Sequence, residues 1–508
     1  MWAWRAWLTP DLALVAAAVA LGYCLVVWDG PRRLFRDADT GWHIRTGERI
    51  LAERSLPRSD PYSFSREGQP WVAWEWGADV LTGWIHRRTG LGGVAWLYAS
   101  AIAASVWLWF RLHWQVGGDF LIACAMAPPM LSTLSLHWLA RPHVFGWILT
   151  LAAIWSAERA GTRFRFRQAA LIGLGSALWA NLHGSFLLGP LIGMIYAVGH
   201  SLRSRIWQET AAESRRRVRW LLCATAVSLL GTLLNPYGWR LHAHVFAYLS
   251  DSQLLARIGE FQSFNFHAEG AGQIMLAVGL AGLGASVALG QRRVAHFLLV
   301  SLLLATALRM ARGLPLLALA GLPLANGAIA SALRGAVSGA ELREGLRRGL
   351  RGALEYSARL RSLEAGRHGA LLALALALAA LWWLRTLAEV ARAGFPADQF
   401  PVAAAAVVEK LPPSARLLST DKFGGYLIYR FAGARKVFFD GRSDFYGAEF
   451  LKQYGRLMQA RPGWRRILES YSLTHALLPV DYPLREALES AGWRLLYADR
   501  VAVLLQRP

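Results

Sequence analysis

The chain has 508 residues, of which 55% are hydrophobic and only 17% are charged, and its formal net charge is +22. Such a low charged fraction excludes a disordered, collagen-like or coiled-coil chain and indicates a membrane protein. The positive charge does not indicate a nucleic-acid partner, because most arginines lie in short loops between apolar segments, where they set membrane topology. The three cysteines lie inside apolar runs and give no disulfide framework.

A helix needs about 20 mainly apolar residues to cross the hydrocarbon core of a bilayer. About eleven such spans are predicted, and the first is interpreted as an uncleaved anchor rather than a signal peptide. The predicted spans lie near 10–28, 91–110, 119–137, 143–157, 168–182, 185–200, 218–234, 272–290, 294–309, 313–331 and 369–385. The fold class is therefore a mainly α, polytopic membrane protein.

Arginine is concentrated in the loops 158–167, 201–217 and 291–293 and in the segment 332–368. Alternate crossings place all four on one side of the membrane, which the positive-inside rule makes cytoplasmic. The N-terminus is then predicted to be cytoplasmic, and the first loop (29–90) and the tail (386–508) extracytoplasmic.

The tail is predicted to be a small α/β domain that follows a membrane domain at 1–385. Its pattern indicates helices at 398–411, 447–459, 463–471 and 484–491. It also indicates strands at 415–419, 426–431, 436–439 and 475–480, with a closing hairpin.

The first loop concentrates carboxylates beside aromatic residues. Asp37 and Asp39 follow the first span directly, and the apolar spacing from Gly41 suits a helix that lies along the membrane interface. One interpretation gives Asp39 only the role of helix cap, and gives Asp60 only the opening of a turn before Pro61. The other makes this cluster catalytic, because a general base needs a carboxylate within reach of a hydroxyl.

The stretch 37–48, the segment 60–63 and Trp74-Glu75-Trp76 resemble membrane proteins of the GT-C superfamily, which are glycosyltransferases that use polyprenyl-phosphate-linked sugars. The resemblance implies a GT-C-like helical core in a bacterial inner membrane. It also implies transfer of a sugar, with inversion, to an extracytoplasmic hydroxyl of a lipid, glycan or protein. The family's base would fall on Asp39, with Asp37 as the competitor.

No cofactor is obligatory for a monophosphate donor, whereas a diphosphate donor or an amide acceptor, as in oligosaccharyltransferases, would favour a divalent metal. No metal ligand is assigned, since His242 and His244 in the loop 235–271 do not have a common ligand spacing. Glu260 in that loop is a further candidate for substrate contact.

Polar groups also occur where later spans meet on the predicted outer side. One explanation of these polar groups is that they belong to tight turns whose side chains contact lipid headgroups. The other is that they bind substrate and phosphate, because arginine offers a forked, permanently charged partner. The residues predicted to bind substrate or phosphate are His43, Asp60, Glu75, Arg141, His143, Asn181, His183, Arg309 and Arg312.

A non-enzymatic transporter of lipid-linked sugars, or an envelope-assembly partner, is the alternative function. A transporter would carry polar residues and interrupted helices near the middle of the membrane in both halves. Here the polar groups gather on one face, which favours the enzyme.

Overall fold

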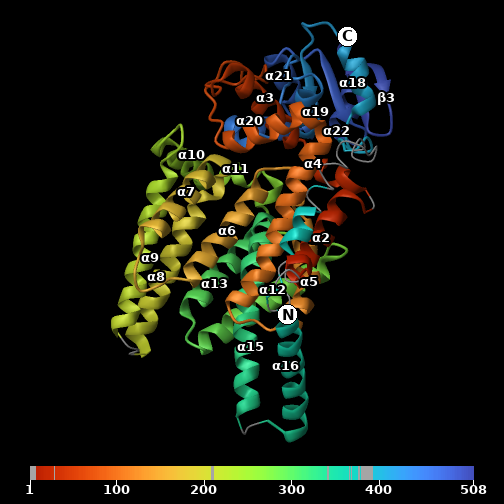
Figure 1. Ribbon diagram of the computed structural model, residues 1–508. Coiled ribbons are helices and arrows are strands. Elements are labelled where there is room, and N and C mark those ends of the chain that lie inside the picture. Colours follow the sequence, from red (N-terminus) through yellow and green to blue (C-terminus); the bar gives the residue numbers. More distant parts are fainter. Residues whose placement is uncertain are drawn as a thin grey trace.

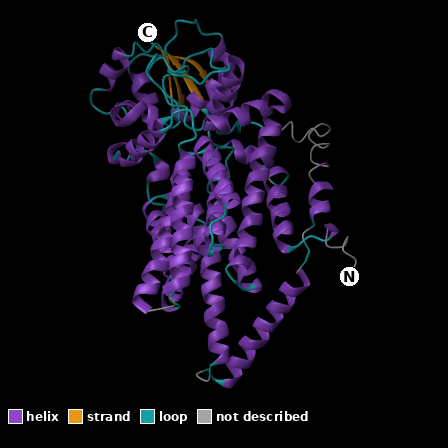
Figure 2. Cartoon of the chain, turned by 60° about the vertical axis from the view of Figure 1, so that its left-hand side comes forward, coloured by secondary structure: helices purple, strands orange, loops and turns teal. Residues whose placement is uncertain are grey.

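The computed structural model describes residues 7–27, 29–207, 211–339, 342–364, 366–367, 369–375, 378 and 393–508. A long bundle of helices is covered at one end by a smaller mixed domain, and the strands lie only in that domain (Figures 1 and 2). We call the covered end the capped end. The cap consists of the first loop and the tail, which lie far apart in the sequence.

Each of the first ten predicted spans falls on a helix or helical stretch of the bundle. The helices are α2 (Leu12–Leu25), α4 (Trp76–Gln115), α5 (Phe120–Ser135), α6 (His143–Glu158), α7 (Phe166–Leu182), α8 (Leu188–Trp207), α9 (Ala211–Thr232), α12 (Ala271–Gly290), α13 (Val294–Arg309) and α15 (Leu322–Ser338). Short helical segments connect or precede them: η1 (Gly30–Phe35), η2 (Gly184–Leu187), η4 (Ala311–Gly313), α14 (Leu314–Leu316) and η5 (Leu317–Gly321).

Four helical stretches among the described residues are long and apolar enough to cross a membrane: Trp76–Gln115, Gly184–Trp207, Ala271–Gly290 and Ala311–Ser338. Shorter apolar helices at Leu12–Leu25, Phe120–Ser135 and Val294–Arg309 accompany them. The eleventh predicted span, 369–385, lies mostly outside the described residues. The total of about eleven crossings therefore stays a prediction.

The arginine-rich parts lie away from the cap. Helices α15 and α16 (Glu344–Glu364) extend beyond the bundle at the end opposite the tail, and the last residues of α8 and the first residues of α9 lie at that same end (Figure 1). The predicted separation of arginine-rich loops from the tail is thus present in the fold.

The helix predicted in the first loop is α3 (Asp39–Glu53), and glycines hold it close to both of its neighbours. An ideal β-carbon on Gly47 would overlap the carbonyl group of Asp79 at the start of α4. One on Gly41 would overlap the carbonyl oxygen of Gly425 in α19 (Asp421–Arg430). The close approach that glycine permits therefore fixes α3, and Asp39 at its start, between the bundle and the tail.

The tail contains a four-stranded sheet with strand order β1-β2-β4-β3. Strand β1 pairs in parallel with β2, and the other pairs are antiparallel, so the predicted closing hairpin is present as β3–β4. The strands are β1 (Leu417–Ser419), β2 (His475–Pro479), β3 (Arg494–Ala498) and β4 (Ala502–Gln506). The helices are α18 (Val402–Glu409), α19, α20 (Ser443–Met458), α21 (Trp464–Ser470) and α22 (Pro483–Ser490).

Two predicted strands of the tail are wrong. Residues 426–431 lie on α19 or just after it, because the side chain of Thr420 accepts a hydrogen bond from the backbone N–H of Phe423 and starts a helix there. Phe423, Tyr426 and Leu427 then bury one helical face. The segment 436–439 forms no strand of the sheet; Val437 makes only an isolated parallel bridge with Ser63 of the first loop.

A buried arginine joins the first loop to the tail. Arg442 Nη2 lies 2.7 Å from both Asp60 Oδ1 and Asp440 Oδ2, and its side chain is only 1% exposed. Asp60 also accepts hydrogen bonds from the backbone N–H groups of Tyr62 and Ser63, so it does form the predicted turn. A buried charge needs such partners, so the first loop and the tail hold each other in place.

Candidate active site

Asp39 lies in the first turn of α3 and does not cap it. The N-cap is Ala38, which makes no side-chain capping bond, and the backbone N–H of Asp39 donates instead to Asp37 Oδ1 at 2.8 Å. Trp42 Nε1 donates to Asp39 Oδ1 at 3.1 Å. The bond from Trp42 orients the Asp39 carboxyl group, whose other oxygen faces Arg141.

Three carboxylates converge on Arg141, which lies in the turn between α5 and α6. Its Nη1 is 2.8 Å from Asp37 Oδ2 and 2.7 Å from Glu260 Oε1, and its Nη2 is 2.8 Å from Asp39 Oδ2. Glu260 lies in the short helix η3 (Gly259–Phe261), and the Arg141 side chain is 15% exposed. We call Asp37, Asp39, Glu260 and Arg141 the acid cluster.

The carboxyl groups of the cluster differ in proton affinity. Burial raises the pKa of Asp39 to about 8; Arg141 opposes this rise, and the charges of Asp37 and Glu260 add to it. Burial also acts to raise the pKa of Glu260, but the positive charges of Arg141 and Arg312 outweigh it and hold that pKa below its ordinary value. Asp39 is therefore the group suited to accept a proton near neutral pH.

A second group of titratable side chains lies beside the acid cluster. His43 Nδ1 is 2.6 Å from Asp79 Oδ1, and His43 Nε2 is 3.7 Å from Glu75 Oε2. Glu75 Oε1 is 3.4 Å from His183 Nε2. Burial raises the pKa of Glu75 to about 7, although Arg312 and Arg141 act against the rise. Glu75 thus links the first loop to the turn after α7.

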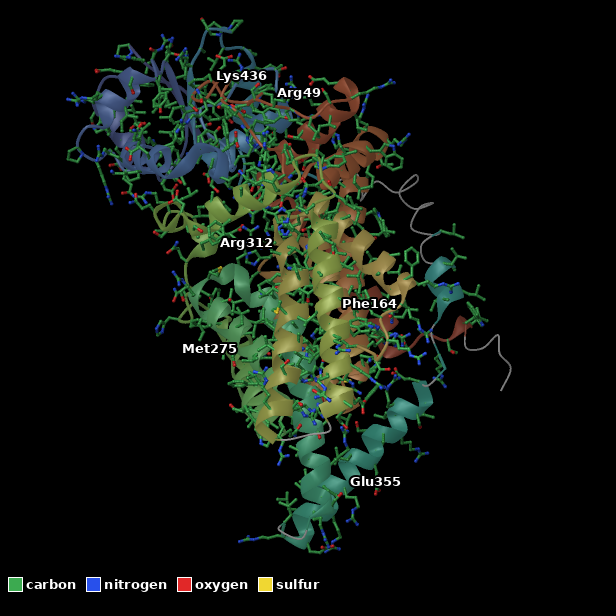
Figure 3. All side chains as sticks on the ribbon, turned by 90° about the vertical axis from the view of Figure 1, so that its left-hand side faces the viewer. Arg49, Phe164, Met275, Arg312, Glu355 and Lys436 are labelled. Atoms are coloured by element: carbon green, nitrogen blue, oxygen red, sulfur yellow. The ribbon has the colours of Figure 1, made fainter. Side chains whose placement is uncertain are left out.

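An apolar cavity of about 450 Å³ opens between α6, α8, α10 (Trp239–Ser250) and the start of α14. Leucine, tryptophan and phenylalanine side chains form much of its wall, and we call it the apolar cavity. Figure 3 shows Arg312 at the level where the bundle meets the cap. The ionisable side chains that line the cavity are His137, His143, His183, Glu260 and Arg312.

A second cavity, of about 810 Å³, lies between α20 of the cap and the segment 257–259, and we call it the tail cavity. Gly441 lines it and lies directly against Asp39, because an ideal β-carbon on Gly441 would overlap Asp39 Oδ1. The acid cluster therefore lies between the two cavities.

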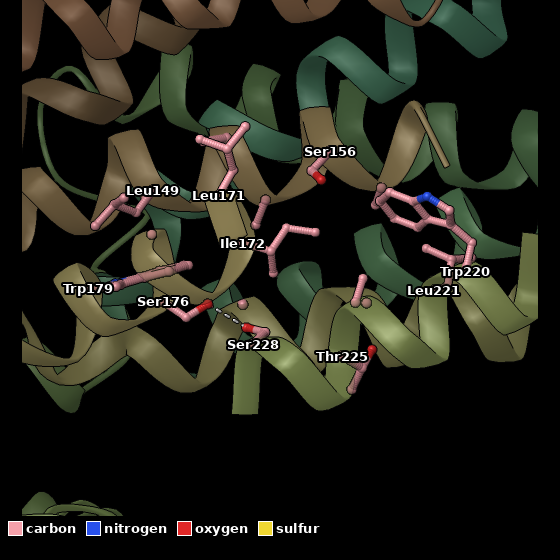
Figure 4. Close-up of a pocket in the computed structure, with 17 residues that line it drawn as sticks. Leu149, Ser156, Leu171, Ile172, Ser176, Trp179, Trp220, Leu221, Thr225 and Ser228 are labelled. Atoms are coloured by element: carbon pink, nitrogen blue, oxygen red, sulfur yellow. Dashed lines mark hydrogen bonds between the residues drawn. The ribbon is translucent and has the colours of Figure 1, made fainter. Parts of the chain in front are cut away.

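A third cavity, of about 240 Å³, lies within the bundle between α6, α7, α8 and α9 (Figure 4). Its lining residues include no ionisable side chain, and Ser176 and Ser228 satisfy each other by a hydrogen bond of 2.7 Å. It contains none of the residues of the acid cluster, so we assign it no role in the site.

Several residues singled out in the sequence come together. Asp37, Asp39 and Arg141 lie in the acid cluster, and His143 and Arg312 line the apolar cavity. His143 Nε2 also lies 2.8 Å from the carbonyl oxygen of His137. With His43, Glu75 and His183 beside them, these residues form one continuous site.

Three of the predicted binding residues lie elsewhere. Asp60 forms the buried ion pair with Arg442 and lies outside the site. Asn181 accepts a hydrogen bond from Trp76 Nε1 at 2.8 Å and donates to the carbonyl oxygen of Leu234 at 2.9 Å, so it ties α7 to its neighbours. Arg309 is exposed and lines none of the cavities described above.

Sequence reasoning did not place Gly441 beside Asp39, and it gave Glu260 only a secondary place. A Gly between two polar residues after a β-rich run reads as a turn, and nothing local shows that Asp39 lies against it. Glu260 carried one signal, its position in an outer loop before aromatic residues.

The carboxylates of the acid cluster do not form a metal site as they are arranged. Each faces Arg141, whose guanidinium lies where a cation would have to bind. Among the described residues, no group of three or more His, Cys, Asp or Glu side chains is placed to hold a metal ion. His242 and His244, the other histidines considered, contact Thr232 and Asp444 respectively.

No family model and no curated protein matches this chain. The solved structures that it resembles include crystal structures of the oligosaccharyltransferase of Archaeoglobus fulgidus. The form tethered to an acceptor peptide has a TM-score of 0.56 at 13% identity, over 92% of this chain and 69% of that one. The apo form has a TM-score of 0.56 at 12% identity, over 94% and 70%.

The complex of the same enzyme with Zn and sulfate gives a TM-score of 0.50 at 12% identity, over 92% of this chain and 68% of that chain. Oligosaccharyltransferase is a membrane glycosyltransferase of the GT-C superfamily. At this identity the likeness shows the fold. The chain therefore shares the fold of this GT-C enzyme, in agreement with the fold that the resemblance in its first loop implied.

Proposed function

We propose that the protein is an inverting membrane glycosyltransferase that moves a sugar from a polyprenyl-phosphate donor to a hydroxyl of an extracytoplasmic acceptor. One observation carries the proposal: Asp39, with a pKa raised to about 8, lies between the two cavities, directly against Gly441 in the wall of the tail cavity and across Arg141 from Glu260 in the wall of the apolar cavity. A base in such a position can meet a lipid-linked donor from one side and an acceptor from the other. The GT-C fold supports this assignment.

The apolar cavity is the proposed site of the donor lipid. Its volume of about 450 Å³ and its apolar wall suit the first isoprene units. Arg312 at its polar end would bind the phosphate, because its Nη1 is 3.6 Å from Glu260 Oε2 and is thus less tightly paired than Arg141. Arg141, already bound by three carboxylates, would instead hold the base in position.

In the proposed reaction, the acceptor hydroxyl gives its proton to the Asp39 carboxylate. The acceptor oxygen then bonds to the anomeric carbon, while the bond from that carbon to the phosphate oxygen breaks. The phosphate leaves with the electron pair and is stabilised by Arg312, with His183 close by. Attack from the face opposite the phosphate inverts the anomeric centre.

No divalent ion is required in this proposal, because the positive charge beside the base comes from Arg141. Transfer is therefore expected to persist when the purified enzyme is assayed in EDTA. Loss of activity in EDTA, with recovery on adding a divalent metal, would contradict this part of the proposal.

The function is tested by mass spectrometry of surface glycans in a deletion strain. We expect the wild-type gene to restore the missing glycan, and Asp39→Asn to lower it about 100-fold or more, as for loss of a general base. Asp29→Asn, which removes an exposed carboxylate in the same loop, is the matched control and should restore it fully. Full rescue by Asp39→Asn at equal protein level would refute Asp39 as the base.

A further inference from the structure

The tail cavity is strongly basic. Four cationic side chains line it, and Asp421 is the one carboxylate in its lining. The cationic residues are Arg257, Lys452, Arg456 and Arg461. A concave surface with such an excess of one sign focuses the electrostatic field and attracts ligands of the opposite charge.

The two arginines at the end of α20 and just after it are available for a ligand. Within the described part of the chain, neither Arg456 nor Arg461 makes an ion pair, and both are exposed. Lys452, in contrast, forms an ion pair with Glu449 on the same helix face, with Nζ 3.6 Å from Glu449 Oε2. An anionic group entering this cavity would therefore meet guanidinium groups that have no ion-pair partner, and guanidinium binds carboxylate and phosphate in a forked geometry.

The proposed base lies directly behind the wall of this cavity. Gly441 in its wall lies against Asp39, and Gly259 precedes Glu260 of the acid cluster. A hydrogen bond of 3.3 Å between Tyr248 Oη and Ser443 Oγ separates this cavity from the apolar cavity. A molecule in the tail cavity thus approaches Asp39 from the side away from the proposed donor lipid.

The size and walls of the cavity suit a short glycan. About 810 Å³ lies within the range of ligand sites for molecules of several rings. Tyr454 lies in the wall, packed against Phe439 with ring centroids 4.5 Å apart, and its ring offers a face for the C–H groups of a sugar.

We propose that the tail cavity binds an acidic glycan, one that bears carboxylate or phosphate groups, as the acceptor. The proposal rests on the proposed function, because it names the substrate class of that same site. Arg456 and Arg461 hold the acidic groups, and a hydroxyl of the glycan is presented to Asp39.

The experiment measures binding rather than transfer, on the full chain in lipid nanodiscs. Fluorescent tetragalacturonate (carboxylate) and a glycerol-phosphate tetramer (phosphate) are compared with neutral maltotetraose and with tetraglutamate. We expect at least one acidic saccharide probe to bind at least tenfold more tightly than maltotetraose and tetraglutamate, and its affinity to fall with salt. The double variant Arg456→Gln/Arg461→Gln should weaken that binding about tenfold, equivalent to about 1.4 kcal/mol.

Arg466→Gln removes an exposed arginine from α21, outside the cavity, and should leave the affinity unchanged. Asp39→Asn should abolish transfer but retain the binding, so the two proposals fail separately. Equal binding of acidic and neutral saccharides, no effect of the double variant, or preference for tetraglutamate would overturn the acidic-glycan assignment.

Discussion

The carboxyl groups of Asp39 and Glu260 face the same guanidinium, that of Arg141, but their pKa values are shifted in opposite directions. Burial raises the pKa of Asp39 to about 8, whereas Arg141 and Arg312 together overcome the effect of burial on Glu260 and lower its pKa. Glu260 therefore stays negative, and its charge helps to keep a proton on Asp39. The cluster thus tunes a single carboxyl group toward proton transfer near neutral pH.

This tuning predicts the pH dependence of transfer. A base must be unprotonated to act, and the pKa of Asp39 is raised to about 8, so kcat/KM should rise with pH and level off above about 8. Glu260→Gln removes a negative charge that raises this pKa, so the rising limb should move to lower pH. The test compares the pH profiles of kcat/KM for the wild type and the variant. A rising limb that stays at the same pH or moves to higher pH in the variant would contradict the assignment of Asp39 as the base.

Gly441 is predicted to be essential because of the space it leaves. A β-carbon there would overlap Asp39 Oδ1, so Gly441→Ala must displace the base and should lower kcat about 100-fold. Gly455→Ala is the matched control, since Gly455 lines the same cavity and a β-carbon there meets nothing within 4 Å. Equal activities of the two variants, at equal expression, would show that Asp39 does not act from this position.

At the scale of elements, the cap contains both buried and exposed ion pairs, and the two kinds contribute very differently to its stability. Arg442 holds Asp60 and Asp440 in a dry environment, where loss of the arginine leaves two charges without their partner. Arg430 and Glu409 form a pair at 3.1 Å whose side chains are 44% and 56% exposed, so water screens it. Only the first pair should matter for stability.

Arg442→Met is accordingly expected to lower the free energy of unfolding of the cap by about 3–5 kcal/mol. Arg430→Met should lower it by less than about 1 kcal/mol. Pulse proteolysis of the two variants in nanodiscs, over a urea series, measures both effects. A loss from Arg442→Met no larger than that from Arg430→Met would mean that the buried network does not hold the cap together.

The helices of the bundle could be predicted because length and hydropathy are local properties of the sequence. The segment 426–431 could not be assigned from its short apolar run, which fits a strand as well as a helix; the capping role of Thr420 decided it. Asp39 could be singled out by its position after the first span. The residues around Asp39 could not be predicted in the same way. Arg141 and Glu260 are 119 residues apart in the sequence and meet only in the folded chain.

For the whole molecule, the first loop and the tail form one cap, whereas the arginine-rich helices lie at the opposite end (Figure 1). Both parts of the cap should therefore face the same compartment, which the positive-inside rule makes extracytoplasmic. On the proposed function, the apolar cavity would then face the lipid and the tail cavity the extracytoplasmic side, with the acid cluster between them.

Cysteine labelling tests this topology. In a Cys223→Ser background, which removes the exposed native thiol, Glu67→Cys and Arg500→Cys place thiols on the cap and Arg348→Cys places one on α16. An impermeant maleimide added to intact cells should label positions 67 and 500, and should label 348 only after permeabilisation. Labelling of 67 and 500 from different sides would rule out a shared cap.

The Asp60–Arg442 pair also has a consequence for biosynthesis. The two residues are separated by 382 positions, so at about 5–20 residues per second the ribosome reaches Arg442 about 20–80 s after Asp60. On the predicted topology, the first loop is exported during that interval, before its counterion is synthesised, and proteases can reach it. The proposed site can therefore form only when the last quarter of the polypeptide arrives, and a nascent chain that stops early should be degraded rather than accumulate.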